Sequence, residues 1–224
     1  MKLVLLGTAD TRTKAPFDDK AWEIWGCQPV LTYPDCKRVD RLFELHDKSY
    51  WGDPAVIQRM NAANVPIVMQ RAVTAIPRSE TFPLAEIGER FQTFIGARYF
   101  TSTIAYMLAY ALLRGGFEEI ALFGIHMAAD EEYGNQRQAM EYWVGVANGM
   151  GVKVTVPEES SICSAKFLYG YDTESTMLTE MRKMAEEFKH ELAQAKGKLD
   201  ADVQLWHEYN GALKMLGKLR RIYS

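Results

Sequence analysis

Cysteine is scarce in this sequence, and the three present, Cys27, Cys36 and Cys163, follow no close spacing. An odd number of widely separated cysteines argues against a disulfide framework and against a zinc site, because both need paired or clustered thiols. We therefore expect a protein of a reducing compartment, the cytoplasm, without a structural metal.

Long apolar runs and an excess of basic residues are also missing. No segment reaches the roughly 20 apolar residues that span a bilayer, and residues 1–9 lack the long apolar region and cleavage site of a signal peptide. The chain carries 26 Lys and Arg against 29 Asp and Glu. We expect no membrane association and no nucleic-acid partner, because non-specific nucleic-acid binding depends on a Lys and Arg excess. A small phosphate-bearing ligand needs only a local site, so the overall charge does not exclude such a ligand.

Six short apolar runs are present, and patterns with helical spacing separate them. The runs are Lys2–Leu6, Glu23–Gly26, Arg41–Leu45, Pro66–Met69, Glu119–Phe123 and Val152–Val156. Helices are expected over 54–64, 104–112 and 136–150. Strands that alternate with helices predict an α/β fold, a Rossmann-like open parallel sheet with flanking helices. The long stretches 10–22 and 73–94 indicate binding loops or, for the second, a small helix or edge strand.

The character of the sequence changes near Thr173. Two amphipathic helices follow, interrupted at Gly197, and they predict a C-terminal α-helical hairpin. We expect two domains, 1–171 for nucleotide binding and 172–224 for oligomerisation. The apolar stripe of the hairpin packs either on the first domain or, as we favour, on another subunit of a homo-oligomer.

The residues that follow the strands are unusually polar. Ligands of open parallel sheets bind beyond the carboxyl ends of the strands. The candidates are Gly7, Thr8, Ala9, Asp10, Gln28, Glu44, His46, Asp47, Gln70, Arg71 and His126. The turn after Leu6 is neither a Gly-x-Gly-x-x-Gly motif nor a P-loop. Its glycine allows close approach of a ligand to the backbone, or it simply ends a strand.

Glu44 and His46 alternate to the same face of their strand, and Asp47 begins the next loop. A carboxylate beside a histidine can orient the ring and make it a general base, or the cluster can hold a ribose. The alternative is that His46 and Asp47 cap the following helix. His126 is a third catalytic candidate, and a purely structural role is the alternative.

Thr101, Ser102 and Thr103 open the helix that contains Ile104. Free backbone N–H groups and hydroxyls at a helix start favour phosphate, whereas ordinary N-capping needs the same residues. The two interpretations are compatible at a strand-end cleft.

The blocks Tyr99–Ala109 and Gly116–His126 resemble a block of bacterial sialyltransferases that use CMP-sialic acid, and of the related DUF115 (MptE-like) family. The resemblance implies a nucleotide-binding fold in which Thr8, Gln28, Ser102 and Thr103 line the nucleotide site. Two positions depart from it: His126 stands where Asp is usual, and Gln28 where Asn is usual. The segment Trp22–Gly26 is similar to small phage-encoded proteins.

The leading hypothesis is therefore a glycosyltransferase-like enzyme, which binds a nucleotide or nucleotide-sugar and transfers or hydrolyses its activated group. A protein that sequesters a nucleotide without catalysis is the alternative. A third hypothesis places the function in assembly through the hairpin. We expect no further cofactor.

Overall fold

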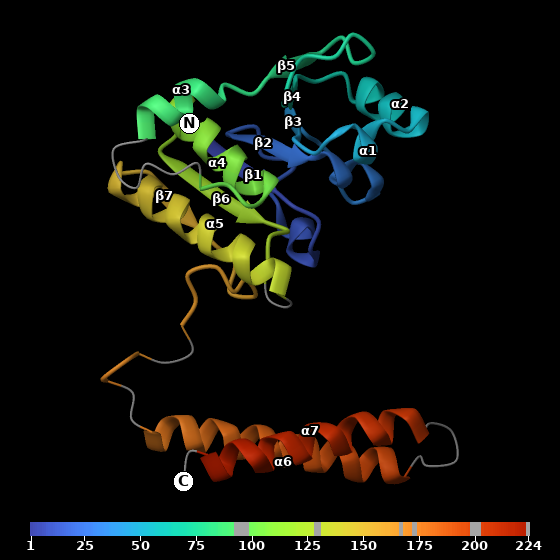
Figure 1. Cartoon of the computed structure of the whole chain (residues 1–224), viewed down its shortest axis with the longest axis vertical. Coiled ribbons are helices and arrows are strands. Elements are labelled where there is room, and N and C mark those ends of the chain that lie inside the picture. The colour runs from blue at the N-terminus through green and yellow to red at the C-terminus, as the bar shows by residue number, and fades with distance from the viewer. Residues whose placement is uncertain (92–98, 128–130, 166–167, 172–173, 198–202, 223–224) are drawn as a thin grey trace. The chain divides into compact units, whose positions relative to one another are not determined.

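The computed structural model describes residues 1–91, 99–127, 131–165, 168–171, 174–197 and 203–222 (Figure 1). The chain divides into two compact units, Met1–Ser164 and Ala165–Ser224. The roles expected for residues 1–171 and 172–224 stay predictions.

The described part of the first unit contains one sheet of seven strands, all paired in parallel. The strands are β1 (Lys2–Leu6), β2 (Trp22–Cys27), β3 (Arg41–Glu44), β4 (Ile67–Met69), β5 (Ser79–Thr81), β6 (Glu119–Phe123) and β7 (Lys153–Thr155). Their spatial order is β5-β4-β3-β2-β1-β6-β7. The Rossmann-like open parallel sheet expected from the sequence is confirmed, and six of these strands match the six apolar runs.

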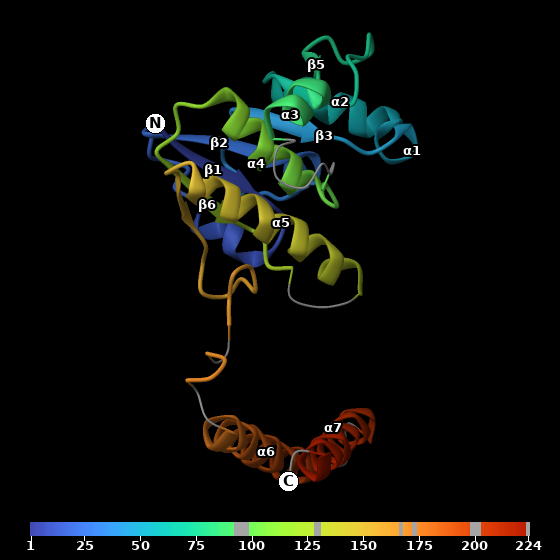
Figure 2. The same cartoon turned by 60° about the vertical axis from the view of Figure 1, so that its left-hand side comes forward.

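Both faces of the sheet are buried around β1, which is why its residues are apolar almost throughout. Leu3 and Leu5 of β1 pack into one core, and Val4 and Leu6 pack into the other. The first core is covered by α3 (Leu84–Phe91), α4 (Thr103–Arg114) and α5 (Glu131–Gly149), as Figures 1 and 2 show. The second is covered by Ala15 and Phe17, which follow the 3₁₀ helix η1 (Asp10–Lys14), by the 3₁₀ helix η2 (Gln28–Thr32), and by α1 (Lys48–Trp51) and α2 (Pro54–Ala63).

Helix α4 is apolar on most of its surface because it lies against β1, β2 and β3 and contacts α3 and α5. Gly115, with a φ of 68°, ends it. The irregular stretch 73–94 contains both of the structures that the sequence offered as alternatives for it, an edge strand, β5, and a helix, α3. Residues 92–94 of that stretch lie outside the described residues.

The second unit contains α6 (Glu174–Gly197) and α7 (Val203–Ile222), which pack against each other. The rings of Phe188 and Tyr209 lie 6.2 Å apart between the two helices. The helical hairpin and its break at Gly197 are confirmed. Over 178–192 and 208–219, where side chains are described, none is buried. The hairpin therefore has no closed core within those ranges.

The strand order places a topological switch point between β1 and β6. From β1 the chain adds β2 to β5 on one side, and it then returns to add β6 and β7 on the other. In open α/β sheets, ligands usually bind beyond the carboxyl ends of the strands at such a point.

Candidate functional site

The loops after β1 and β6 touch at two glycines. Gly7 N donates to Phe123 O over 2.8 Å, and Ala9 N donates to Gly124 O over 2.9 Å. A Cβ on Gly7 would lie 2.3 Å from Gly124 O, and Gly124 has a φ of 70°. Gly7 is therefore needed for the contact between two backbones, which accounts for it without a ligand.

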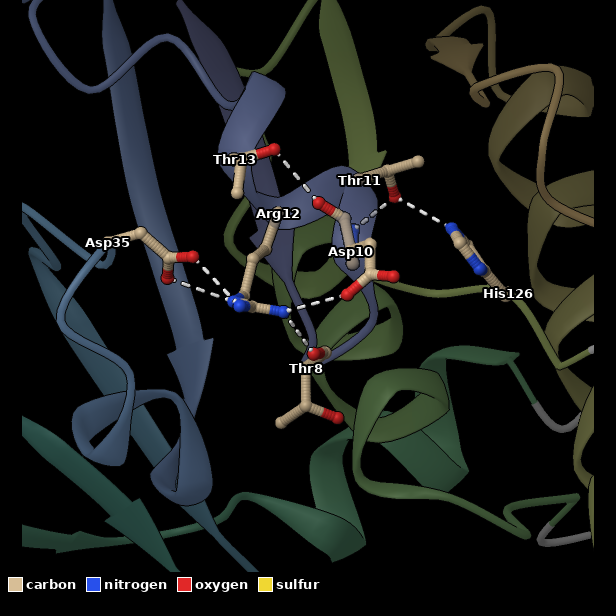
Figure 3. Close-up of polar contacts among 8 residues, drawn as sticks. Thr8, Asp10, Thr11, Arg12, Thr13, Asp35 and His126 are labelled. Carbon is tan, nitrogen blue, oxygen red and sulfur yellow. Dashed lines mark hydrogen bonds and ion pairs between the residues drawn. The ribbon is translucent and has the colours of Figure 1, made fainter. Parts of the chain in front are cut away.

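Thr11 holds His126 at this edge of the sheet (Figure 3). The Thr11 side chain is buried, and its Oγ1 accepts a hydrogen bond from Gly124 N over 2.9 Å and lies 3.0 Å from His126 Nε2. A hydroxyl that accepts from Gly124 can still donate its own proton to Nε2. The His126 carbonyl accepts from Ser161 N and Oγ, over 3.0 and 2.7 Å. The partly exposed imidazole is thus fixed from two loops.

Arg12 clamps the same loop from its other side, as Figure 3 also shows. Its guanidinium donates to both carboxylate oxygens of Asp35, over 2.9 and 2.8 Å, and to Thr8 O over 2.8 Å. It also lies 4.0 Å from the centre of the Tyr33 ring. The hydrogen bond to Asp35 raises the pKa of Arg12 above its usual value. Sequence reasoning missed this residue, because nothing in the spacing links Arg12 to Asp35.

Gln28 begins η2 directly beyond β2, next to the end of β1. Its side chain is 6% exposed, and the amide makes no hydrogen bond to another described residue. The atoms of this amide are not among the buried polar atoms without a partner, so solvent reaches them. Gln28 therefore has unused hydrogen-bonding capacity beside the switch point.

Helix α4 begins at Thr103, with Ser102 as its N-cap. Ser102 Oγ accepts from Ala105 N over 3.3 Å, so the capping interpretation is confirmed. Because β6 runs parallel to β1 and α4 leads into β6, α4 runs against the strands, and its N-terminus lies toward their carboxyl ends. Phosphate binding by Ser102 and Thr103 stays a prediction.

The row of polar residues divides into two groups, because β2 lies between β1 and β3. Gly7, Thr8, Ala9, Asp10 and His126 surround the switch point, and Gln28 follows β2. Two strand spacings of about 4.8 Å separate β3 from β1. The sequence grouped all of these residues because it could not give the strand order.

Glu44 and His46 form a pair at the end of β3, as their alternation predicted. Glu44 is 2% exposed, and its Oε1 accepts from His46 N over 2.9 Å and lies 2.6 Å from His46 Nδ1. The imidazole is half exposed and stacks on Tyr50, with ring centres 4.7 Å apart. The buried carboxylate thus sets the orientation of the ring.

Asp47 and Gln70 have structural partners nearby. Asp47 caps α1, where it accepts from the backbone and hydroxyl of Ser49, and these bonds lower the pKa of its carboxyl. The helix-cap interpretation is therefore confirmed for Asp47. Gln70 Nε2 donates to Leu45 O over 2.7 Å, which ties the loop after β4 to the loop after β3.

The described residues give little support to a metal site, a cysteine nucleophile or a membrane-spanning helix. No group of three His, Cys, Asp or Glu among them is arranged to hold a metal ion. Burial raises the pKa of the Cys27 thiol to about 12, so it is a poor nucleophile. None of the described helices is long and apolar enough to cross a membrane.

These features define an α/β protein with a Rossmann-like sheet and a polar switch point. No family model and no curated protein matches the chain. Similar solved structures include the sialyltransferase CstII from Campylobacter jejuni in complex with a substrate analogue, cytidine-5′-monophosphate. It is 13% identical with a TM-score of 0.47, over 75% of this chain and 88% of that chain. A CST-II variant in complex with CMP is also 13% identical, with a TM-score of 0.43, over 77% and 93%. At such identity the likeness concerns the fold alone.

Proposed function

We propose that the first unit binds a nucleotide or nucleotide-sugar at the switch point and transfers or hydrolyses its activated group. The observation that carries the proposal is the meeting of two loops at this point, one with Thr8 to Asp10 and the other with His126. The topology makes this the default ligand crevice. The unpartnered amide of Gln28 and the N-terminus of α4 supply groups suited to a base or sugar and to phosphate.

His126 is the catalytic candidate at this site. Its Nε2 contacts Thr11, and the ring is partly exposed at the edge where a ligand would lie. A fixed imidazole can exchange a proton with a leaving group or an attacking hydroxyl. Glu44 and His46, named as catalytic from the sequence, lie two strands away and are less suited to that step.

The proposal is tested by incubating the full chain with CMP-sugars, UDP-sugars and NAD and measuring both binding and product. CMP-sugars are the first class to test because of the resemblance of residues 99–109 and 116–126. We expect one class to bind, and His126→Ala to abolish product while the bound fraction persists. Binding without product in the wild-type chain would favour the sequestering alternative. Absence of binding by every class would contradict both.

Ser102→Ala combined with Thr103→Ala tests the phosphate position. We expect the double variant to bind the same nucleotide at least about tenfold more weakly, since it loses charge-assisted hydrogen bonds. The loss of the cap alone costs about 1 kcal/mol of stability, so the protein stays folded. An unchanged affinity in the folded variant would remove these residues from the site.

We further propose that the hairpin joins copies of this chain into a homo-oligomer. The proposal rests on the absence of buried side chains over 178–192 and 208–219. Two helices that leave Met184 and Met215 exposed gain most by pairing with two more, as in a four-helix bundle.

A further inference from the structure

A cavity of about 420 Å³ lies beyond the carboxyl ends of β3 and β4. Its volume is within the range of small-molecule sites. Polar side chains of two loops line it, together with an apolar surface from α1, α2 and β4. The polar residues are His46, Asp47, Lys48, Gln70 and Arg71, and the apolar ones include Trp51, Ile57 and Met69.

Three charged side chains line this cavity, and two of them, Lys48 and Arg71, are positive, against the carboxylate of Asp47. Lys48 and Arg71 are exposed and form no ion pair with a described carboxylate. The Asp47 carboxylate accepts two hydrogen bonds from Ser49, which satisfy part of its charge. Glu44 is buried, and it does not line the cavity. A ligand in the cavity therefore meets two cations and one carboxylate, an excess of one positive charge.

His46 adds a ring nitrogen with a fixed direction, and the protonated ring donates from it to an anion. Its Nδ1 lies 2.6 Å from Glu44 Oε1, and its ring stacks on Tyr50. Nε2 is on the side of the ring remote from Glu44, so it is the nitrogen that remains for a ligand. A histidine held in this way loses little rotational freedom on binding.

We propose that this cavity binds a small organic anion. Its carboxylate or phosphate group lies between His46, Lys48 and Arg71, and its apolar body lies over Trp51 and Met69. Arginine and lysine beside an imidazole provide the charge-assisted hydrogen bonds that such oxyanions prefer. The site is three strand spacings, roughly 14 Å, from the switch point, and it does not depend on nucleotide binding there.

The test follows the ring signals of His46 by NMR in the full chain, during titration with inorganic phosphate and with acetate at constant ionic strength. The chain has four histidines, and His46→Asn identifies the signals of His46. We expect at least one of the two anions to shift these signals saturably. Arg71→Gln should weaken that binding about tenfold, the loss for one charge-assisted hydrogen bond. Arg78→Gln, an exposed arginine outside the cavity, is the matched control and should change nothing.

Three results would overturn the proposal. They are no saturable shift of His46 with either anion, an equal effect of Arg71→Gln and Arg78→Gln, and a shift produced by methyl glucoside but by neither anion. If phosphate shifts the ring signals of His126 and not those of His46, it binds at the switch point, which also counts against this cavity. The two sites are separated by measuring nucleotide affinity in Lys48→Gln, which should equal that of the wild-type chain.

Discussion

At the scale of single residues, the contact between Gly7 and Gly124 determines how closely the two central loops approach. Gly124 combines a φ of 70° with a position where a Cβ would lie 2.4 Å from Gly7 O. Both conditions exclude other residues without a shift of the backbone. The geometry of the switch point thus depends on the absence of two side chains.

We expect Gly124→Ala to lower the free energy of unfolding by about 2 kcal/mol or more, from the left-handed conformation and the overlap with Gly7. Urea denaturation measures it. Gly88→Ala is the control, because Gly88 lies inside α3 with no atom within 4 Å of a Cβ. That change should stabilise the protein slightly, since alanine is the better helix former. Equal effects of the two variants would show that the close contact is not needed.

Thr11→Val removes the hydroxyl that bridges Gly124 and His126 while it keeps the shape of the side chain. It leaves the buried Gly124 N–H without a partner, so we expect a loss of about 1–3 kcal/mol in the free energy of unfolding. Thr11→Ser retains the hydroxyl and should lose less. If the two variants unfold at the same urea concentration, the hydrogen bonds of Thr11 contribute little.

The local pairs were predictable from the sequence, and the distant ones were not. Alternation along a strand was enough to pair Glu44 with His46, because both residues belong to one short segment. Thr11 and His126 are 115 positions apart, and Arg12 and Asp35 are 23 apart. Those contacts follow from the strand order, and no local pattern encodes it.

At the scale of elements, the amino ends of β1, β6 and β7 are joined through one carboxylate. Glu119 contacts Lys2 and Lys153, over 3.0 and 2.9 Å, and Thr155 Oγ1 over 3.1 Å. The hydrogen bonds from Lys153 and Lys2 lower the pKa of Glu119 to about 2. The ordinary value is 4.5, so the ionised carboxylate is favoured in the folded state.

The depressed pKa of Glu119 predicts a pH dependence of stability. The contribution of this carboxylate is complete above about pH 4.5, its pKa in the unfolded chain, and is lost as the pH falls toward about 2. We expect Glu119→Gln to be less stable than the wild-type chain at pH 7, with a difference that shrinks between pH 5 and pH 2. Thermal unfolding across that range measures it. A difference independent of pH would show that the charge of Glu119 is not the cause.

The elements themselves were largely predictable. Long apolar runs and helical periodicity predicted β1, β6 and α4 to within a few residues. Strand β5 was only an open alternative, because its three residues, Ser79–Thr81, are polar and lie at the edge of the sheet. A strand with so few apolar residues leaves no periodic signal.

At the scale of the whole molecule, the two units can be separated by ending the chain after Tyr171. We expect the shortened chain to be monomeric and the full chain to be an oligomer, because the hairpin has no described buried side chain of its own. Light scattering measures both masses. If both chains are monomeric, the hairpin packs within its own subunit, and the oligomer proposal is wrong.

The position of β1 in the middle of the sheet has a consequence for folding. The hydrogen bond between Gly124 N and Thr11 Oγ1 joins residues 113 positions apart. This contact at the switch point therefore closes a loop of more than half the chain. Contacts of such high contact order form slowly, because the entropy of loop closure is lost before they are made. During synthesis β1 and β2 are made long before β6, so β1 can pair with both of its neighbours only after β6 has been made. The switch point is therefore among the last parts of the first unit to assemble, and ligand binding there would report completed folding.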